Sequence, residues 1–367
     1  MSPKTPGLRL WLRAETKPNE RRAPLVPADV EVLVKAGAEV VVERCPNRVF
    51  EEGEYAQAGA RLAEEGTWRQ APADAVILGL KELPEETDPL VHRHVYFAHA
   101  YKGQKGAEEL LGRFTSGGGK LLDLEFLLDD AGRRVAAFGR WAGFVGAAVA
   151  VDVWARQQLA VDQSYPRLDA FADRDALLSW LERRLKSVAS LTERFPSILL
   201  FGAKGRCGAG ALDLLKRVGL DKRTLAWDKE ETAAGGPFPQ ALERDIVLNC
   251  VLLGGPTKPF LTDELLDQPR KLSVIADVSC DPYSPHNPLP IYKETTTPDR
   301  PVLRLRENPP LDLTAIDHLP TLLPRESSED FSAQLLPHLK TLAKGSSVWT
   351  RAEKLFQEKT ALVAAAR

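Results

Sequence analysis

The chain has 367 residues, which is more than one hydrophobic core usually serves, so two domains are expected. Its formal net charge of −2 excludes the strongly basic footprint of a nucleic-acid-binding protein. No apolar run approaches the roughly 20 residues of a membrane helix, and the N-terminus lacks the apolar core of a signal peptide. We therefore expect no membrane partner and a cytoplasmic location. The four cysteines have no CxxC spacing, so no metal site is expected.

Short apolar runs alternate with amphipathic segments along the first part of the chain, which is typical of α/β proteins. A helix is predicted over residues 27–37, with a proline near its start and a glycine after its end. A long helix rich in small residues, over about 140–161, suits close packing and a connection between domains. A surface loop near 162–173 and a helix near 174–191 follow. The strands predicted before the long helix are EVVVE (39–43), AVILGL (75–80), VYFAHA (95–100) and KLLDLEF (120–126).

The second part of the chain is predicted to form a parallel, doubly wound domain, because apolar strand-like runs again alternate with helical segments. The proline-rich region 282–310 predicts loop or edge structure, and 348–366 predicts a helix with apolar spacing near 3.6. We expect two Rossmann-like domains with a cleft between them: a catalytic domain of 1–140 plus 320–367, and a dinucleotide-binding domain of 141–319. The predicted strands of the second domain are SILLFG (197–202), TLAWD (224–228), DIVLNCVLL (245–253) and LSVIADVS (272–279).

A glycine-rich turn joins the strand at 197–202 to an amphipathic segment, with glycines at 202, 205, 208 and 210. Glycine lets the main chain approach a ligand, and the following helix N-terminus offers N–H groups and a positive dipole end to a pyrophosphate. Asp228 ends the next strand roughly 20 residues on, where a ribose hydroxyl is usually held. A carboxylate there without an adjacent arginine favours NAD over NADP.

The glycine spacing departs from the standard GxGxxG pattern, and a tight strand-to-helix turn without a ligand is the alternative interpretation. Arg206 is placed to lie along the pyrophosphate, whereas Cys207 fits packing as a small apolar residue. Both residues belong to the first turn of the predicted helix.

Charged groups follow the predicted strands of the first domain, where α/β proteins keep their sites. Arginines suit an anionic substrate, and a lysine together with a histidine can move protons. Taken one at a time, each has a structural alternative: a solvated surface charge, a structural histidine, or a salt-bridge network that only orders loops. The charged residues are Lys17, Glu20, Arg21, Arg22, Lys81, Glu82, His99, Lys102, Glu125, Arg133 and Arg134, and the same segments add the aromatic Phe138.

Together these motifs resemble the saccharopine dehydrogenase family, the NAD-dependent, lysine-forming enzymes of the α-aminoadipate pathway. The resemblance runs nearly end to end, and its wider relatives are the alanine dehydrogenases and the NAD-binding part of transhydrogenase. It implies oxidation of the secondary amine of saccharopine by NAD, then hydrolysis of the imine to lysine and 2-oxoglutarate, by a monomer. The matching stretches are LRAETKPNERRAPLVP, LGLKELPEE, FAHAYKGQ, DLEFL, GRRVAAFG, GAKGRCGAGALDLL, WDKEET, ADVSCDPYSPHNPLPIY and IDHLPTLLPRESSEDFS.

The resemblance also implies roles for residues. The proton chemistry is assigned to Lys81 and His99, and Arg22, Arg134 and Phe138 match substrate-contacting positions. From their charge, we also expect Glu82 and Glu125 as auxiliary groups and Lys17 and Lys102 on the substrate side, where all four set the local charge around the acid–base pair. The cofactor-binding positions are Arg133, Gly205, Arg206, Cys207, Asp228, Thr232, Leu252, Val278, Ile316, Asp317, His318 and Leu319.

Two features of the cofactor side leave alternatives open. The family has a cysteine pair at the positions of Cys207 and Cys250 that is able to form a disulfide, although two reduced, packed thiols suit a cytoplasmic enzyme better. Leu252 stands where the family pattern has a tyrosine, which puts an aromatic contact in doubt. The rival functions are another amino-acid dehydrogenase, such as an alanine dehydrogenase, and an NAD-binding sensor without catalysis.

Overall fold

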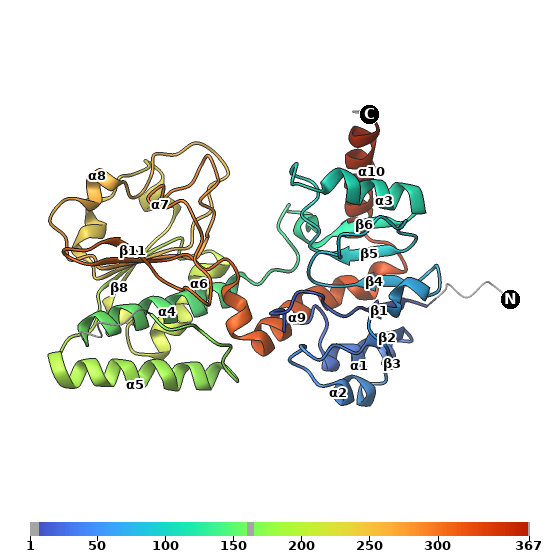
Figure 1. Ribbon diagram of the computed structural model, residues 1–367, viewed down its shortest axis with the longest axis horizontal. Coiled ribbons are helices and arrows are strands. Elements are labelled where there is room, and N and C mark those ends of the chain that lie inside the picture. Colours follow the sequence, from blue (N-terminus) through green and yellow to red (C-terminus); the bar gives the residue numbers. More distant parts are fainter. Residues whose placement is uncertain (1–6, 160–164, 366–367) are drawn as a thin grey trace. The chain divides into compact units, whose positions relative to one another are not determined.

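The computed structural model describes residues 7–159 and 165–365, which form two compact units. Unit 1 comprises residues 1–137 and 327–367, and unit 2 comprises residues 138–326. Each unit holds a six-stranded sheet with helices packed on it, so the predicted α/β class with Rossmann-like sheets is confirmed (Figure 1). The part of the predicted surface loop at 160–164 lies outside the described residues.

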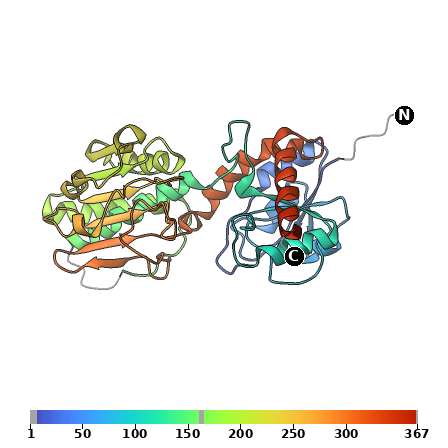
Figure 2. The ribbon, with the colours of Figure 1, turned by 90° about the horizontal axis from the view of Figure 1, so that it is seen from above.

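Unit 1 is built on a fully parallel sheet with the strand order β3-β2-β1-β4-β5-β6. The C-terminal helix α10, red in Figures 1 and 2, packs against β6. The strands are β1 (Arg9–Leu12), β2 (Glu39–Glu43), β3 (Arg61–Ala63), β4 (Val76–Leu78), β5 (Arg93–Tyr96) and β6 (Lys120–Asp123). The helices are α1 (Pro27–Lys35), α2 (Glu52–Gln57), α3 (Ala107–Gly117), α9 (Pro324–Leu342) and α10 (Ser347–Ala365), with short 3-10 turns η1 (Thr67–Gln70) and η2 (Leu124–Phe126).

Helix α1 shows how the sequence sets its own boundaries. Pro27 occupies the first turn, where a missing N–H costs nothing, and Asp29 complements the positive end of the helix. Gly37 follows the helix with a φ of +90°, a conformation that a side chain would strain. Buried serines of α9 fix the segment that leads into α1, since Ser328 Oγ accepts the Ala23 N–H at 2.9 Å.

Unit 2 has the strand order β11-β12-β10-β9-β7-β8, in which only the edge strand β11 runs antiparallel to its neighbour. This edge strand lies in the proline-rich region, as predicted. The strands are β7 (Ile198–Phe201), β8 (Thr224–Trp227), β9 (Ile246–Asn249), β10 (Val274–Asp277), β11 (Leu303–Arg306) and β12 (Leu311–Thr314). The helices are α4 (Gly139–Gln158), α5 (Arg174–Thr192), α6 (Arg206–Arg217), α7 (Lys229–Thr232) and α8 (Asp263–Leu266), with 3-10 turns η3 (Asp221–Arg223), η4 (Pro239–Glu243) and η5 (Leu319–Leu322).

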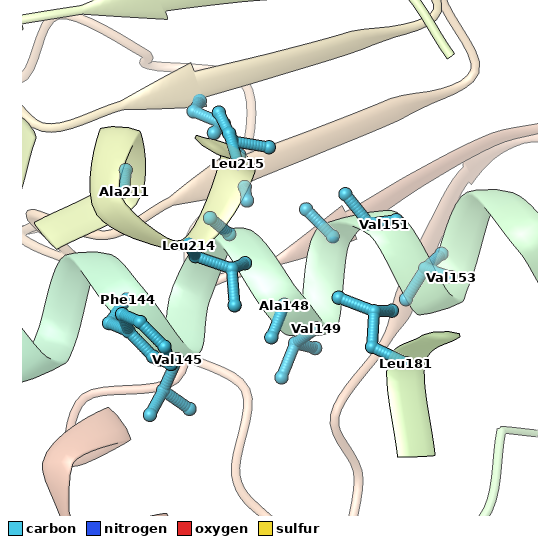
Figure 3. Packing of buried hydrophobic residues seen from close by; sticks show 14 of the residues in the cluster. Phe144, Val145, Ala148, Val149, Val151, Val153, Leu181, Ala211, Leu214 and Leu215 are labelled. Atoms are coloured by element: carbon cyan, nitrogen blue, oxygen red, sulfur yellow. The ribbon is translucent and has the colours of Figure 1, made fainter. Parts of the chain in front are cut away.

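Two hydrophobic cores cover the two faces of the unit 2 sheet, because alternate residues of a strand point to opposite faces. In β7, Ile198 and Leu200 join the core made with α4, α5 and α6, whereas Leu199 and Phe201 join the core on the other face. Figure 3 shows Leu214 and Leu215 of α6 close to the α4 side chains of the first core. A strand buried on both faces reads as a continuous apolar run, which is why β7 was predictable.

Helices α4 and α6 touch through glycines. A Cβ at Gly143 would lie 1.7 Å from the carbonyl oxygen of Cys207, and one at Gly210 would lie 1.8 Å from that of Arg140. Both neighbours are backbone atoms and cannot rotate away, so only glycine permits this approach. The small residues predicted to favour close packing of the long helix therefore contact the helix that follows the glycine turn. Among the described residues, none of the helices is both long and apolar enough for a membrane span.

Replacing Gly210 with alanine is expected to destabilise unit 2. The added methyl group must displace the backbone of α4, and overpacking of this kind costs about 1–3 kcal/mol. Gly53→Ala is the matched control, since a Cβ at that helical glycine meets nothing within 4 Å. Urea unfolding followed by circular dichroism should show a lower free energy of unfolding for Gly210→Ala and no loss for Gly53→Ala. Equal stability of the two variants would contradict the packing argument.

Candidate active site

A chain of alternating charges crosses the carboxyl ends of β4, β5 and β6 in unit 1. Glu82 lies between Lys17 and His99, with its oxygens 4.0 Å from Lys17 Nζ and 3.5 Å from His99 Nε2. The other ring nitrogen of His99 is 3.7 Å from Glu125 Oε2, so a carboxylate faces each side of the imidazole. His99 has a φ of +52°, an uncommon backbone conformation for a residue with a side chain. Its side chain is 45% exposed and therefore open to a ligand.

Glu125 contacts two further cationic side chains at this edge of the sheet. It accepts a 2.6 Å hydrogen bond from Lys102 Nζ and lies 4.0 Å from the Arg134 guanidinium. Beneath it, the buried Asp123 accepts the Glu125 N–H at 2.9 Å and a main-chain hydrogen bond from Ala98. Burial raises the pKa of Asp123 to about 6. One buried carboxyl group thus ties together the loops that carry His99 and Glu125.

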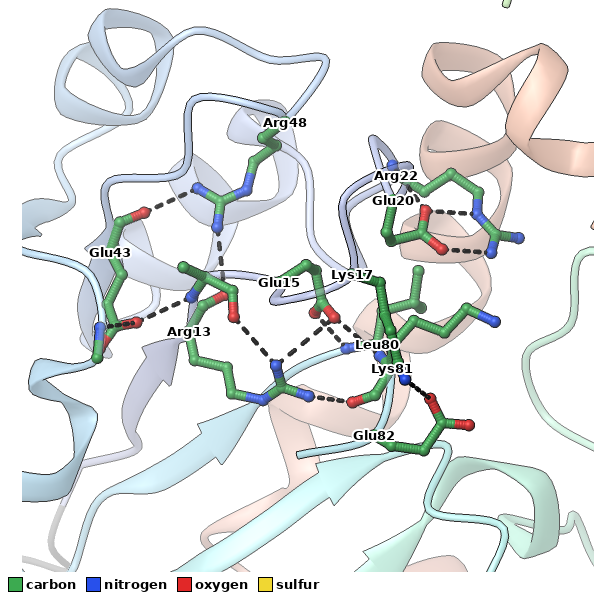
Figure 4. Close-up of polar contacts among 12 residues, drawn as sticks. Arg13, Glu15, Lys17, Glu20, Arg22, Glu43, Arg48, Leu80, Lys81 and Glu82 are labelled. Atoms are coloured by element: carbon green, nitrogen blue, oxygen red, sulfur yellow. Dashed lines mark hydrogen bonds and ion pairs between the residues drawn. The ribbon is translucent and has the colours of Figure 1, made fainter. Parts of the chain in front are cut away.

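Arg22 is engaged inside unit 1. Its guanidinium forms a two-pronged contact with Glu20, Nε at 2.8 Å and Nη2 at 2.6 Å, and both side chains are almost fully buried (Figure 4). Burial alone would raise the pKa of Glu20, but the charge and hydrogen bonds of Arg22 outweigh it and the pKa lies below its usual value. The substrate-binding role expected for Arg22 stays a prediction.

Lys81 sits on the segment that follows β4, and two residues not identified from the sequence hold its main chain. Glu15 accepts the Lys81 N–H at 2.9 Å, and Arg13 donates to the Lys81 carbonyl oxygen (Figure 4). Both come directly after β1, a strand that the sequence reading did not identify. The run RLWL at 9–12 was the available signal, since apolar residues ending in a charged loop resemble the other strand ends.

The glycine turn of unit 2 connects β7 to α6 as predicted. Gly202 has a φ of +83°, and Gly205 is the N-cap of the 12-residue helix α6 without a side-chain capping hydrogen bond. A Cβ at Gly208 would lie 2.1 Å from the Gly202 carbonyl oxygen, so the turn is as tight as a chain allows. A helix N-terminus that no side chain caps, reached through glycines, fits a pyrophosphate group.

Asp228 follows β8 and faces this turn. Its carboxylate accepts the Lys204 N–H at 2.6 Å and the Lys229 N–H at 2.8 Å. These two main-chain hydrogen bonds, that of Lys229 above all, hold the pKa of Asp228 below its usual value. An ionised carboxylate beside the turn fits the ribose hydroxyl of NAD. The Thr232 hydroxyl is turned inward and donates to the Asp228 carbonyl oxygen at 2.9 Å.

The other residues predicted on the cofactor side lie in different surroundings. The side chains of Val278, Ile316 and Leu319 are buried in the core of unit 2, so only their main chains are available to a ligand. Leu252 is 66% exposed and Asp317 pairs with His318 at 3.3 Å. Arg133 belongs to unit 1, where it pairs with Asp129. Phe138, which was predicted to bind the substrate, precedes α4 in unit 2. The structure therefore does not gather Arg133 with the glycine turn inside one unit.

The cysteines are free thiols. Burial raises the pKa of Cys207 to about 11 and holds that of Cys250 well above its usual value, so both remain protonated near neutral pH and are weak nucleophiles. In the structure, Cys207 and Cys250 are therefore two reduced thiols packed against the core of unit 2. Within residues 7–159 and 165–365, no group of three or more His, Cys, Asp or Glu side chains is placed to hold a metal ion.

Comparisons with known proteins agree with these features. Residues 11–145 match the family described as alanine dehydrogenase/PNT, N-terminal domain. The chain is 47% identical to saccharopine dehydrogenase [NAD(+), L-lysine-forming] of Yarrowia lipolytica, over 96% of this chain and 98% of that protein. It is also 47% identical to the enzyme of the same name from Schizosaccharomyces pombe, over 95% and 97%. An L-alanine dehydrogenase structure shares the fold with a TM-score of 0.66 at 17% identity, covering 96% of this chain and 94% of the other.

Glu20→Gln is expected to destabilise unit 1, because it leaves the buried Arg22 charge without its carboxylate. Breaking such a pair costs about 3–5 kcal/mol. The pKa of Glu20 is lower in the folded protein than in the unfolded chain. Its contribution to the free energy of unfolding is therefore fully present above the unfolded pKa of about 4.3, and it is lost as the pH falls through the folded pKa. The difference between variant and wild type in urea unfolding should therefore be large at pH 7 and shrink below about pH 4.

The exposed pair of Lys35 and Glu31 provides the control, since Glu31→Gln should change the free energy of unfolding by less than about 1 kcal/mol. Removing both partners with Glu20→Gln/Arg22→Met should recover much of the loss. A Glu20→Gln variant as stable as wild type at pH 7 would show that the pair is not a structural anchor.

Proposed function

The chain belongs to the saccharopine dehydrogenase [NAD(+), L-lysine-forming] family, and on that basis we propose that it oxidises saccharopine to lysine and 2-oxoglutarate. Identity of 47% over nearly the whole length of two such enzymes supports the substrate. The observation that carries the chemistry is the row of charges in unit 1, where Glu82 and Glu125 flank His99 and bring cationic side chains to the same edge.

The reaction balances as saccharopine, NAD and water giving lysine, 2-oxoglutarate, NADH and a proton. In saccharopine the ε-nitrogen of lysine is bonded to the α-carbon of a glutarate unit. NAD supplies the hydride acceptor for that carbon when it is bound. In unit 2, the N-terminus of α6 would hold the pyrophosphate and Asp228 the ribose hydroxyl, which fits the uncapped helix and the ionised carboxylate.

Lys81 accepts the proton of the secondary amine. Nitrogen must release its lone pair before the neighbouring carbon can lose hydride, so a neutral amine positioned at a strand end is a suitable base. Glu15 and Arg13 fix the main chain of Lys81. Glu20 lies near enough for the charge of Lys81 to help lower its pKa, and it is bound to Arg22.

His99 activates the water that attacks the imine and then moves protons as the carbinolamine collapses. Glu82 and Glu125 face its two ring nitrogens and so orient the ring for either direction of transfer. The carbon–nitrogen bond breaks, the nitrogen leaves as the lysine amine, and the carbon becomes the keto carbon of 2-oxoglutarate.

Cationic side chains at the same edge bind the carboxylates of the substrate. Saccharopine carries three, and Arg134 is the arginine best placed for one of them, since 40% of its side chain is exposed and Glu125 lies at 4.0 Å. The exposed Lys102 shares Glu125 with Arg134, and the exposed Lys17 pairs with Glu82 on the other side of His99. Arg22 is the weaker candidate because its side chain is only 5% exposed, whereas that of Arg134 is 40% exposed.

The enzyme acts in the cytoplasm as a monomer on these small molecules. Its four free thiols suit a reducing compartment. Size-exclusion chromatography with light scattering measures the mass of the particle, and fractionation of cells that express the native protein locates it.

A spectrophotometric assay tests the proposed reaction in the reverse direction. NADH absorbance should fall when lysine and 2-oxoglutarate are supplied together, and should not fall with either alone. Pyruvate with ammonia is the comparison for an alanine dehydrogenase. Turnover only with pyruvate and ammonia, or binding of NADH without turnover on any pair, would reject saccharopine as the substrate.

Lys81→Met and His99→Gln are each expected to lower kcat by about 10²–10⁴, the usual contribution of one general acid–base group. NADH binding, measured by fluorescence, should be unchanged because the glycine turn lies in unit 2. Lys35→Met, on the exposed face of α1, is the control and should keep the wild-type kcat. Full activity in the double variant Lys81→Met/His99→Gln would reject both roles.

Arg134→Ala is expected to raise KM for saccharopine far more than KM for NAD, because a charge-assisted contact to one carboxylate is lost. Steady-state kinetics with each substrate varied in turn measures the two constants. Arg351→Ala removes another exposed arginine of unit 1, which pairs with Asp130, and should leave both unchanged. An equal rise of both constants for Arg134→Ala would count against a substrate contact.

A further inference from the structure

We propose that Arg13 and Glu15 are positioning residues for Lys81, forming a buried ion pair that fixes the main chain of the catalytic lysine. The inference rests on the proposed role of Lys81 and adds two residues that act through it without touching the substrate.

The first observation is the pattern of hydrogen bonds around residues 80 and 81. The Glu15 carboxylate accepts the Leu80 N–H at 2.6 Å and the Lys81 N–H at 2.9 Å. Arg13 donates through Nη2 to the Lys81 carbonyl oxygen, and its Nη1 lies 3.5 Å from Glu15 Oε2. Both polar groups of the Lys81 main chain are therefore bound by one ion pair, as Figure 4 shows.

The second observation is that this pair is out of solvent. The side chains of Arg13 and Glu15 are 1% and 3% exposed. Hydrogen bonds to a charged group are stronger than neutral ones, and removal of water strengthens them further. The two charges also compensate each other, so this ion pair, called the clamp below, adds little net charge near Lys81. Lys81 must itself be deprotonated before it can act as a base.

The third observation is a glycine that the clamp requires. A Cβ at Gly79 would lie 2.3 Å from Arg13 Nε, so the guanidinium lies against the main chain just before Lys81. On the other side, the Gly79 N–H donates to the Val95 carbonyl oxygen at 3.0 Å and the Phe97 N–H donates to that of Leu80 at 3.1 Å. The segment is thus held from the end of β1 and from the end of β5.

Arg13 is itself fixed. Its Nη1 donates to the Ala14 carbonyl oxygen at 3.0 Å, and its guanidinium carbon lies 5.6 Å from the centre of the Tyr96 ring. Its own carbonyl oxygen accepts from Arg48 at 3.2 Å. A guanidinium with such fixed surroundings holds its partner in one place, whereas a lysine at this position would offer a single flexible ammonium group.

The expected consequence is kinetic. A general base works only within hydrogen-bonding reach of its proton, and a misplacement of about 1 Å can cost about 10² in rate. Glu15→Gln and Arg13→Lys should each lower kcat by about 10²-fold for saccharopine. NADH binding should stay as in the wild type, because neither residue belongs to unit 2.

Glu43→Gln is the matched control for a loss of stability. Glu43 is also buried, and its carboxylate accepts the N–H groups of Ala14, Gly66 and Trp68 and the indole N–H of Trp11, none of which belongs to residues 79–81. It should lose thermal stability and keep its kcat. A fall in kcat for Glu43→Gln as large as that for Glu15→Gln would make the effect one of general stability and would overturn the inference.

The decisive experiment combines Glu15→Gln with Lys81→Met. If Glu15 acts through Lys81, its replacement has no further effect on the residual kcat once the amine is gone. Losses that multiply in the double variant, or a wild-type kcat for the single variant, would overturn the inference. If Glu15→Gln does not fold, Arg13→Lys is combined with Lys81→Met in the same comparison. A wild-type kcat for Lys81→Met would instead reject the proposed role of the lysine, and this inference with it.

Discussion

Parallel pairing of β4, β5 and β6 is the constraint on which the polar edge of unit 1 depends. The register pairs Leu78 with Val95 and Tyr96 with Asp123, so the ends of the three strands lie within one residue of one another. Parallel strands send their carboxyl ends to one edge, and the loops that carry Lys81, His99 and Glu125 must therefore emerge together. A register shift of one residue would turn every strand side chain to the opposite face and separate these loops.

Carboxylates hold in place the charged side chains and loops that follow these strand ends. Glu82 and Glu125 stand between cationic groups that would otherwise repel one another, while Glu20 occupies Arg22 and Glu15 binds main-chain N–H groups. The exposed members of this set are available to a ligand, and the buried members fix the loops. The difference between these roles follows from burial, because ion pairs in water contribute little and buried ones are costly to break.

The sequence predicted those parts of the molecule whose signals are local. The run ending at Phe201, the glycines after it and Asp228 lie within one strand–turn–helix–strand segment, and Lys81 and His99 each follow an apolar run directly. The burial of Arg22 was not predictable, because it depends on how the loop before α1 folds back on itself. The role of Glu15 escaped for a related reason: its partners Leu80 and Lys81 are 65 and 66 residues away, and only the pairing of β1 with β4 brings them together.

Isotope transfer tests most directly whether these two units act as one amine dehydrogenase. The substrate is saccharopine with deuterium at the α-carbon of its glutarate unit, incubated with NAD and the full-length protein, with NADH and lysine analysed by mass spectrometry. The account predicts NADH that carries the deuterium and an equal amount of unlabelled lysine. NADH without deuterium, or lysine released without NADH, would contradict hydride removal from that carbon and with it the function assigned to the site.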